Sequence, residues 1–316
     1  MKSEHIRQRI ALIAGLVFVA SAAGAVTDES VRAELVRLEK SKGLAIAFYD
    51  NVLGVVSFKK RGYYELGKLV PMGSSAGTVS FDGSEVAINS SNWGPGYRDH
   101  TRSLDIVATD GRGIREYREA LASEGCWSRD KSKLDITIFN PPESHVGILD
   151  LGSRKIHAFA PQMNYETSHF NSQCWSPDNK ELVFETDGKV QVFEIEKDQM
   201  RTLAVGTQPT WSPDGNWISY RDRDDYYVIQ PSGDGKKKLF HKRRAVSALF
   251  WSPDSRFVAY VHEDLLALDV EFYHLMVRRL EDGDEDWVAD GVACCINYQW
   301  IENPDLLKRA LAEGKR

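Results

Sequence analysis

The phrase Trp-Ser-Pro-Asp recurs along the chain and limits its possible folds more than any other feature. Intact copies begin at Trp175, Trp211 and Trp251. Proline presets the backbone for a turn, and the Asp side chain can accept hydrogen bonds from nearby amides. A short apolar run follows each copy, as in residues 217–220. Each copy therefore predicts an inner strand ending at Trp, a tight turn and a second strand.

Degenerate copies extend the repeat in both directions. Arg129 replaces Pro in the copy after Trp127, Phe81 precedes Asp-Gly, and Trp300 begins a last remnant. The intervals of 36 to 49 residues match the period of four-stranded propeller blades. We therefore predict an all-β fold, a six-bladed β-propeller of four-stranded antiparallel blades. The predicted structural anchors are Phe81, Trp127, Trp175, Trp211, Trp251 and Trp300.

The two ends of the repeat region complement each other. Residues 44–70 contain three strand-like runs without a leading motif, and the remnant at Trp300 can supply a fourth strand. Pairing residues 297–301 with the sheet formed by residues 44–70 would remove the exposed sheet edges. We expect the propeller to span residues 44–301. A short helix that ends at Gly43 is predicted within 26–43, and a second short helix is predicted within 302–316.

The repeat resembles that of the TolB-like β-propellers, a WD-repeat-like family whose signature is Trp-Ser-Pro-Asp-Gly followed by a short apolar strand. The resemblance covers about residues 44–301 and is strongest between 171 and 261. The copies at Phe81 and Arg129 depart from the signature. A full TolB carries a sizeable α/β domain ahead of its propeller, which residues 26–43 are too short to form. The resemblance therefore implies the fold without equating this chain with TolB itself.

The first 25 residues have the plan of a secretory signal peptide. Lys2, Arg7 and Arg9 precede an apolar run over 10–20, and small residues lead up to Ala25. A membrane anchor is the alternative, but the run is about half of what a bilayer core requires. We expect cleavage after Ala25, a periplasmic or secreted monomer and no stable membrane insertion. Cleavage would also remove Glu4 and change the formal net charge from −6 to −8. A mildly acidic protein gives no general reason to expect nucleic acid as a partner.

The four cysteines do not form a recognisable disulfide or metal pattern. Cys126 and Cys174 each precede a motif Trp, and Cys294 and Cys295 are adjacent. A chain this long does not need a dense disulfide scaffold, and metal ligands are usually spaced. We expect buried free thiols and predict no metal or cofactor, although the oxidation state of either pair stays open.

Two enzyme hypotheses deserve comparison with the sequence. Residues 73–77 read Gly-Ser-Ser-Ala-Gly, the pattern of serine hydrolases, but a strand-like run follows where those enzymes have a helix. Six-bladed calcium lactonases gather carboxylates around the central channel. Of the three residues before each anchor, only Glu124 is charged. A propeller hydrolase or lactonase with a metal ion in the channel therefore remains the alternative to a non-catalytic protein.

One face of the predicted propeller concentrates unusual residues. The loops between second and third strands share a face with the links between blades, opposite the Ser-Pro-Asp turns. Aromatic and arginine side chains there suit a binding surface, unless the aromatics fold their own loop onto the blade. We predict a non-catalytic extracytoplasmic binding or scaffolding module that captures a protein or peptide partner in the cell envelope. The predicted binding residues are Trp93, Tyr97, Arg98, His100, Tyr165, His169, Arg243 and Arg244.

Overall fold

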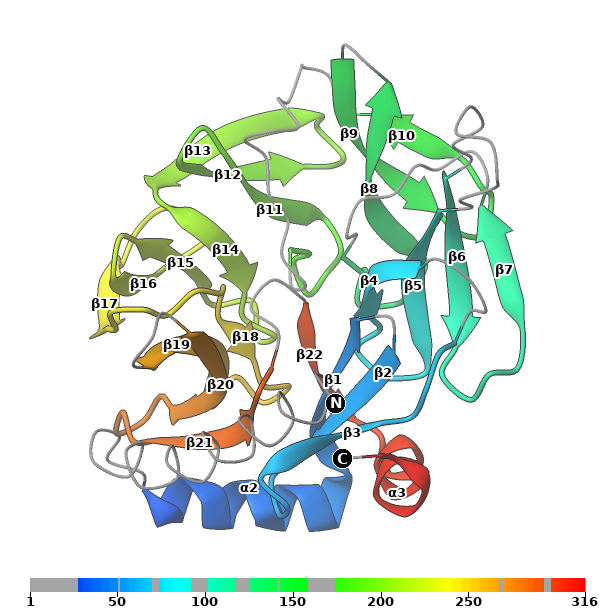
Figure 1. Cartoon of the computed structure of the whole chain (residues 1–316). Helices are drawn as coiled ribbons and strands as arrows, with labels where there is room; N and C mark the ends of the chain where they lie inside the picture. The colour runs from blue at the N-terminus through cyan, green and yellow to red at the C-terminus, as the bar shows by residue number, and fades with distance from the viewer. Residues whose placement is uncertain are drawn as a thin grey trace.

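The computed structural model describes residues 28–50, 52–69, 74–91, 102–117, 126–140, 143–158, 174–266, 270–292 and 297–315. The predicted signal peptide and Glu124 lie outside these residues. Antiparallel sheets are arranged around a common centre, with helices α2 (Glu29–Lys42) and α3 (Pro304–Glu313) on the outside (Figure 1). The first and last described strands, β1 (Leu44–Asp50) and β22 (Tyr298–Glu302), lie side by side in this view.

The sheet that contains the start of the chain also contains its last strand. In β1, Ile46 pairs with Trp300 and Ala47 pairs with Gln299 of β22. This pairing confirms that residues near 297–301 join the sheet formed by the first strands. The last of the three strands, β3, ends at Glu65, before the end of the predicted region at residue 70. The members of this sheet are β1 (Leu44–Asp50), β2 (Val52–Ser57), β3 (Gly62–Glu65) and β22 (Tyr298–Glu302).

The next four strands continue from β1. Tyr49 pairs with Gly77, and Asp50 pairs with Ala76, so β1 and β4 belong to one eight-stranded sheet. The pairing involves the last two residues of β1 and two residues in the middle of β4. The added strands are β4 (Ser74–Val79), β5 (Glu85–Ser91), β6 (Arg102–Ala108) and β7 (Ile114–Tyr117).

Four further sheets follow in chain order, each an antiparallel meander. Two of them have three strands, and isolated bridges from Trp127 to Leu134 and from Trp175 to Leu182 extend these sheets at their inner edges. The strands of the three-stranded sheets are β8 (Lys133–Asn140), β9 (Glu143–Asp150) and β10 (Ile156–Ala158), then β11 (Glu181–Thr186), β12 (Lys189–Glu194) and β13 (Gln199–Val205). The strands of the four-stranded sheets are β14 (Thr207–Trp211), β15 (Ile218–Asp222), β16 (Asp225–Ile229) and β17 (Lys237–His241), then β18 (Phe250–Trp251), β19 (Phe257–Leu266), β20 (Val270–Arg279) and β21 (Glu285–Asp290).

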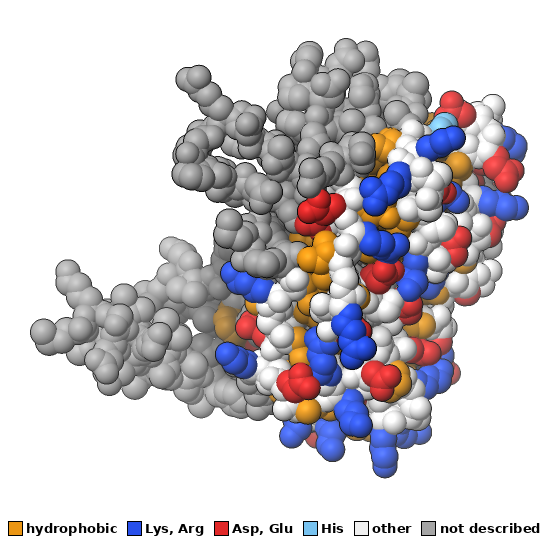
Figure 2. Space-filling model, turned by 90° about the vertical axis from the view of Figure 1, so that its right-hand side faces the viewer, with side chains coloured by type: hydrophobic (Ala, Val, Ile, Leu, Met, Phe, Trp, Pro, Cys, Tyr) orange, Lys and Arg blue, Asp and Glu red, His pale blue; other side chains and the backbone are white. Residues whose placement is uncertain are grey.

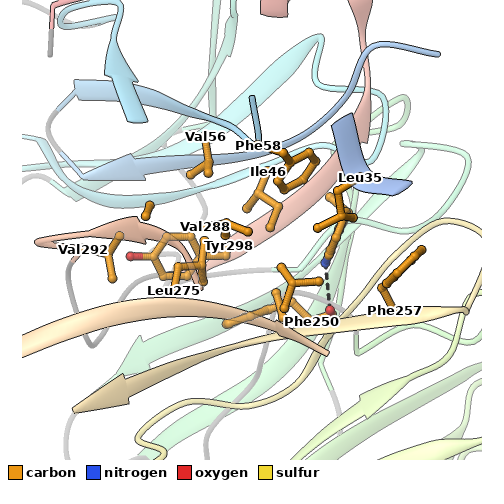
Figure 3. Packing of buried hydrophobic residues seen from close by; sticks show 14 of the residues in the cluster. Leu35, Ile46, Val56, Phe58, Phe250, Phe257, Leu275, Val288, Val292 and Tyr298 are labelled. Carbon is orange, nitrogen blue, oxygen red and sulfur yellow. Dashed lines mark hydrogen bonds between the residues drawn. The ribbon is translucent and has the colours of Figure 1, made fainter. Parts of the chain in front are cut away.

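Three motif tryptophans connect neighbouring sheets. The indole Nε1 of Trp127 donates to the carbonyl of Thr78 at 2.9 Å, and that of Trp175 donates to the carbonyl of Cys126 at 2.9 Å. Trp300 repeats the contact with the carbonyl of Phe250 at 2.8 Å (Figure 3). These three indoles therefore pack between two sheets, and each donates to a carbonyl of the preceding sheet.

Helix α2 (Glu29–Lys42) packs against the sheets where the ends of the chain meet. Asp28 caps its first turn by accepting from the Ser30 amide, and Gly43 ends it at φ 69°. A side chain at Gly43 would also collide with Pro304, because an added Cβ would lie 2.5 Å from backbone atoms of Pro304. The helix thus ends at a residue that only glycine suits, for both its left-handed backbone and its close neighbour.

Helix α3 (Pro304–Glu313) covers the other side of the same junction. Asn303 caps it by accepting from the Leu306 amide at 2.9 Å. Leu306 and Leu307 are buried beside β-strand residues of the first sheet. A second apolar cluster, seen in Figure 3, joins α2 to β1, β2, β19, β20 and β22 through Leu35, Ile46, Phe58, Phe257 and Tyr298 among others.

Candidate functional site

The repeated turns have one hydrogen-bonding pattern. In the last intact copy, Ser252 Oγ donates to Asp254 Oδ1 at 2.6 Å and accepts from the Phe257 amide at 2.9 Å. The same two contacts recur in other units, and the hydrogen bond from Ser176 lowers the pKa of Asp178 below its usual range. The polar groups of the motif therefore bind one another, which makes the turns structural. The other serines with this pair of contacts are Ser80, Ser128, Ser176 and Ser212.

This pattern corrects the predicted alignment of the copy at Phe81. Ser80 makes both motif contacts, at 2.8 Å to Asp82 and 3.1 Å from the Glu85 amide, and so occupies the Ser position. Val79 then holds the Trp position, and Phe81 holds the Pro position. The prediction of Phe81 as a Trp equivalent was wrong by two residues. The Ser-Asp pair determines which residues form the turn. In the sequence alone, the aromatic ring of Phe81 is the more obvious match to the motif Trp.

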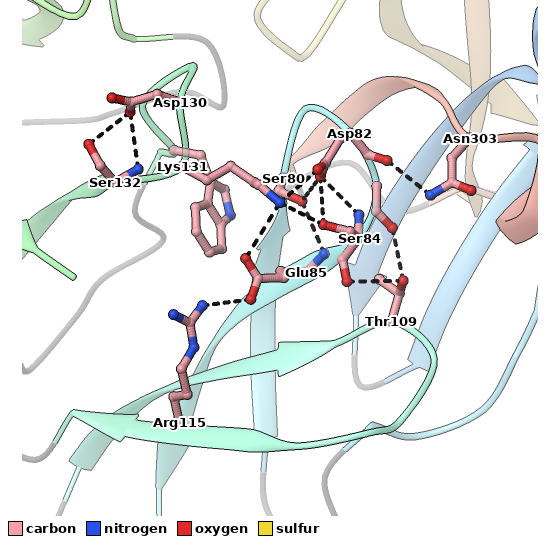
Figure 4. Close-up of polar contacts among 12 residues, drawn as sticks. Ser80, Asp82, Ser84, Glu85, Thr109, Arg115, Asp130, Lys131, Ser132 and Asn303 are labelled. Atoms are coloured by element: carbon pink, nitrogen blue, oxygen red, sulfur yellow. Dashed lines mark hydrogen bonds and ion pairs between the residues drawn. The ribbon is translucent and has the colours of Figure 1, made fainter. Parts of the chain in front are cut away.

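An ion-pair network connects this turn to the turn of the neighbouring sheet (Figure 4). Lys131 Nζ lies 2.7 Å from Asp82 Oδ2 and donates to Ser84 Oγ at 2.9 Å. Burial alone would raise the pKa of Asp82, but hydrogen bonds from Lys131, Ser80 and Ser84 outweigh it and lower the pKa to about 2. Asp82 is therefore a partnered anion at neutral pH.

The motif turns surround a cavity of about 290 Å³. Arg129, the residue that replaces Pro, lines it with its guanidinium stacked 4.2 Å above the Phe81 ring. Its backbone N–H, which proline would lack, donates to Asn179 Oδ1 at 2.8 Å. Burial lowers the pKa of Arg129 from its ordinary value. The cavity is lined by Phe81, Asp82, Arg129, Asp130, Lys131, Pro213, Trp251, Pro253, Gln299, Trp300 and Glu302.

The chemistry of this cavity is mixed. Trp251, Trp300 and two prolines offer apolar walls, and cationic and anionic side chains both reach the lining. Within the described part of the chain, the Arg129 guanidinium forms no ion pair, whereas Lys131 is held by Asp82. The cavity could accommodate a small amphipathic group.

A second cluster lies in the interior, between two neighbouring sheets. Cys126 and Cys174 are free and buried, as the sequence predicts, and Asp135 on β8 lies beside them. The Asp135 carboxylate accepts from the Cys126 amide at 2.5 Å and from the Cys174 thiol at 3.4 Å. Burial raises the pKa of Asp135 to about 7 and raises the pKa of both thiols. The sequence analysis singled out the two cysteines of this cluster, because each precedes a motif Trp. No pattern in the sequence pointed to Asp135.

The predicted binding face is only partly within the described residues. Trp93, Tyr97, Arg98, His100, Tyr165 and His169 lie outside them. Arg243 and Arg244 are described and exposed, and neither forms an ion pair within the described ranges. The backbone at Arg244 has φ 59°, and its carbonyl accepts from the Glu263 amide at 2.9 Å. These two arginines are thus presented on a segment that is tied to β19.

A histidine that sequence analysis did not single out lies near this segment. His274 Nδ1 is 2.5 Å from Asp290 Oδ1, and its Nε2 is 2.9 Å from Asp264 Oδ2. Burial opposes protonation, but the two carboxylates outweigh it and raise the pKa of His274. The hairpin register of β19 and β20 places His262 opposite His274. Only the register of β19 against β20 would have indicated the cluster.

The structure also bears on the serine-hydrolase hypothesis. Ser75 lies within β4, which continues to Val79 before the turn. The nucleophile of those enzymes sits on a turn from strand to helix, so the context of Ser75 is different.

Acidic and basic side chains are interspersed over the side of the molecule shown in Figure 2. None of the described helices combines the length and hydropathy of a membrane span.

Comparison with known proteins identifies the architecture. No protein-family profile and no curated protein sequence matches the chain. Among solved structures, TolB from Acinetobacter baumannii superposes with a TM-score of 0.57 at 11% identity, covering 81% of this chain and 66% of TolB, just under two thirds. The fold is that of a TolB-like β-propeller.

Other solved propellers are similarly close in shape. An oligogalacturonate lyase in complex with manganese superposes with a TM-score of 0.52 at 14% identity, covering 79% of each chain. A chain of a nidogen/laminin complex reaches 0.60 at 8% identity, covering 82% of this propeller and 98% of its own length. At these identities the similarity establishes the fold and leaves the activity of this propeller to its own residues.

Proposed function

We propose that this propeller is a non-catalytic extracytoplasmic binding or scaffolding module that captures a protein or peptide partner. The presence of TolB and a nidogen/laminin complex among its structural neighbours supports a binding role. The internal bonding of the Ser-Pro-Asp turns supports assigning that face a structural role. Binding then falls to the opposite face, where loops differ from sheet to sheet.

The exposure of Arg243 and Arg244 carries this proposal. Two adjacent guanidinium groups without ion pairs in the described chain are available to an acidic partner, and their segment is held by the hydrogen bond between Arg244 and Glu263. A held segment loses less conformational entropy on binding. The aromatic residues Trp93 and Tyr97 would add apolar contact area on the same face.

The test is capture of a partner from a cell-envelope extract by immobilised protein. Arg243→Ala with Arg244→Ala should weaken capture by about tenfold or more, and Trp93→Ala with Tyr97→Ala should do the same. A charge-matched control is Arg112→Ala with Lys180→Ala, since both side chains are exposed near the turn face. If this control abolishes capture and the other pairs leave it unchanged, the binding face has been misassigned.

The sheets support a division into six blades. The eight-stranded sheet divides into β22-β1-β2-β3 and β4-β5-β6-β7, because the described strands of its halves pair with each other only at Tyr49, Asp50, Ala76 and Gly77. The four later sheets would be the other blades. Truncation before Ala293 removes β22 and should lower the melting temperature of the whole domain. An unchanged melting transition would contradict the closure.

Export to the periplasm or the medium is part of the same proposal. The tripartite start of the sequence supports it, and TolB among the structural neighbours is consistent with it. Mass measurement of protein made in a Gram-negative host should give a mature chain that starts at Val26. An intact Met1 in soluble cytoplasmic protein would refute export.

A propeller lyase, hydrolase or lactonase is the second candidate. It is favoured by the similarity to oligogalacturonate lyase, whose solved structure contains manganese. Metal analysis separates the two: calcium or manganese held tightly and stoichiometrically by purified protein, and lost together with an activity, would favour the enzyme over the binding module.

A further inference from the structure

The cluster of Cys126, Asp135 and Cys174 brings three ligand atoms to one place. Their two sulfurs and one carboxylate oxygen all lie within 4.8 Å of one another. The side chains are essentially inaccessible, with exposed fractions of 0%, 2% and 0%. Two neighbouring sheets contribute, because Cys126 precedes Trp127 and Cys174 precedes Trp175. A ligand bound here would therefore join those sheets.

The surroundings make an unoccupied cluster costly. Its neighbours in the core include Ile148, Leu182 and Phe184. Asp135 accepts from the Cys126 amide and the weakly polar Cys174 thiol, and no Lys, Arg or His pairs with it in the described chain. A buried carboxylate without a cationic partner is strongly disfavoured. A bound cation would supply the missing positive charge.

Corresponding positions in other sheets show that the fold does not require this chemistry. In the sheet of β14, the positions equivalent to Cys126 and Asp135 are Thr210 and Ser219. The hydroxyls of these two residues are 2.6 Å apart. The sheet of β18 has Phe250 opposite Ala259. A hydroxyl pair or an apolar pair thus fills the same space, and two thiols with a carboxylate go beyond what packing needs.

We propose that Cys126, Asp135 and Cys174 form a binding site for a thiophilic divalent cation of the Zn²⁺ class. Zn²⁺ prefers sulfur and carboxylate oxygen in tetrahedral geometry, in which a water molecule would be the fourth ligand beside these three side chains, and Zn–S bonds of about 2.3 Å would bring the sulfurs to about 3.8 Å apart. The ligand atoms therefore need to move together by roughly 1 Å or less. Binding releases the two thiol protons, and also the carboxyl proton in those molecules in which Asp135 is protonated, and no electron transfer is involved.

The site would act as a clamp between two sheets. Its occupancy is independent of the proposed partner-binding role, because the cluster is buried and Arg243 and Arg244 are exposed. Calcium does not suit it, since hard cations select oxygen ligands. Zn²⁺ and the spectroscopic probe Co²⁺ are the appropriate ions.

The experiment uses the mature protein, reduced, treated with a chelator and then freed of it. Titration with Co²⁺ should produce visible bands of tetrahedral coordination with sulfur-to-metal charge transfer, saturate at one ion per chain and be reversed by Zn²⁺. Zn²⁺ should also raise the melting temperature. Cys126→Ser, Cys174→Ser and Asp135→Asn should each weaken Zn²⁺ affinity more than about 100-fold, beyond the usual effect of residues that only support a ligand.

The matched control is Cys294→Ser with Cys295→Ser, which should leave Co²⁺ binding unchanged. If the cysteine variants fail to fold, the nearly isosteric Asp135→Asn and the wild-type Co²⁺ spectrum decide the question. Absence of sulfur-to-cobalt charge transfer in the folded wild type would overturn the proposal. So would loss of binding in the control alone, or a Cys126–Cys174 disulfide found by peptide mapping of protein purified without reductant.

Discussion

Arg61 and Asp286 form an ion pair between residues that are 225 positions apart in the sequence. Arg61 Nη2 lies 2.9 Å from Oδ1 and 3.0 Å from Oδ2 of a carboxylate that is fully buried. The guanidinium also lies 4.3 Å from the centre of the Trp287 ring. The pair therefore joins the turn after β2 to β21, at the junction where the first and last sheets meet.

Replacing Arg61 should destabilise the fold strongly. Arg61→Met leaves the Asp286 carboxylate buried without its partner, and such losses typically cost about 3 kcal/mol or more. Urea denaturation measures the change in unfolding free energy. The control is Arg201→Met, which breaks an exposed pair with Glu181 and should cost less than about 1 kcal/mol. Equal effects of the two substitutions would contradict a special role for the junction.

The indole hydrogen bonds should be measurable by comparing two tryptophans. Trp300→Phe leaves the Phe250 carbonyl without its donor, whereas Trp211 Nε1 has no acceptor within the described residues. Both substitutions lose similar ring volume, so the difference isolates the hydrogen bond. We expect Trp300→Phe to cost about 1 to 3 kcal/mol more than Trp211→Phe in denaturant unfolding. A larger loss at Trp211 would show that ring packing, and not the indole N–H, dominates.

The motif serines should each contribute to stability through the backbone. Ser252→Ala removes the acceptor for the buried Phe257 amide and the donor to Asp254, with an expected cost of about 1 to 3 kcal/mol. Ser232→Ala is the control, because its contact with Asp234 is exposed. Its melting temperature should stay close to that of the wild type. A silent Ser252→Ala would mean that the turn tolerates loss of the motif.

Asp135 should make the metal-free protein less stable as the pH rises. Its pKa of about 7 lies above the ordinary 3.8, so folding favours the protonated form. This contribution is complete below the unfolded pKa and is lost as the pH rises through about 7. The unfolding free energy of Asp135→Asn minus that of the wild type should therefore increase between about pH 5 and pH 8, by a few kcal/mol at most. Urea denaturation at both pH values, with chelator and reductant present, measures the difference; a difference that stayed constant or reversed would refute the assignment.

The turns and helix ends were predictable because their interactions are local. In a motif turn, Ser252, Asp254 and the Phe257 amide lie within six residues, so one short phrase contains every donor and acceptor it needs. The ends of α2 follow the same logic, with Asp28 and Gly43 at its two caps. Repetition of that phrase at blade spacing then indicated a propeller, and the remnant at Trp300 indicated the pairing of β22 with β1.

Tertiary structure decided whatever depends on the partner of a residue in another sheet. The position of Phe81 became clear from the bonds of Ser80, since a lone aromatic can match either of two motif positions. Asp135 acquired its raised pKa and its two thiol neighbours because neighbouring inner strands bring residues 126, 135 and 174 together. Arg129 and Arg61 likewise gained Phe81 and Asp286 through packing of separate sheets. Burial and cross-sheet proximity control the energy of a charge, and neither is encoded in the residues beside it in sequence.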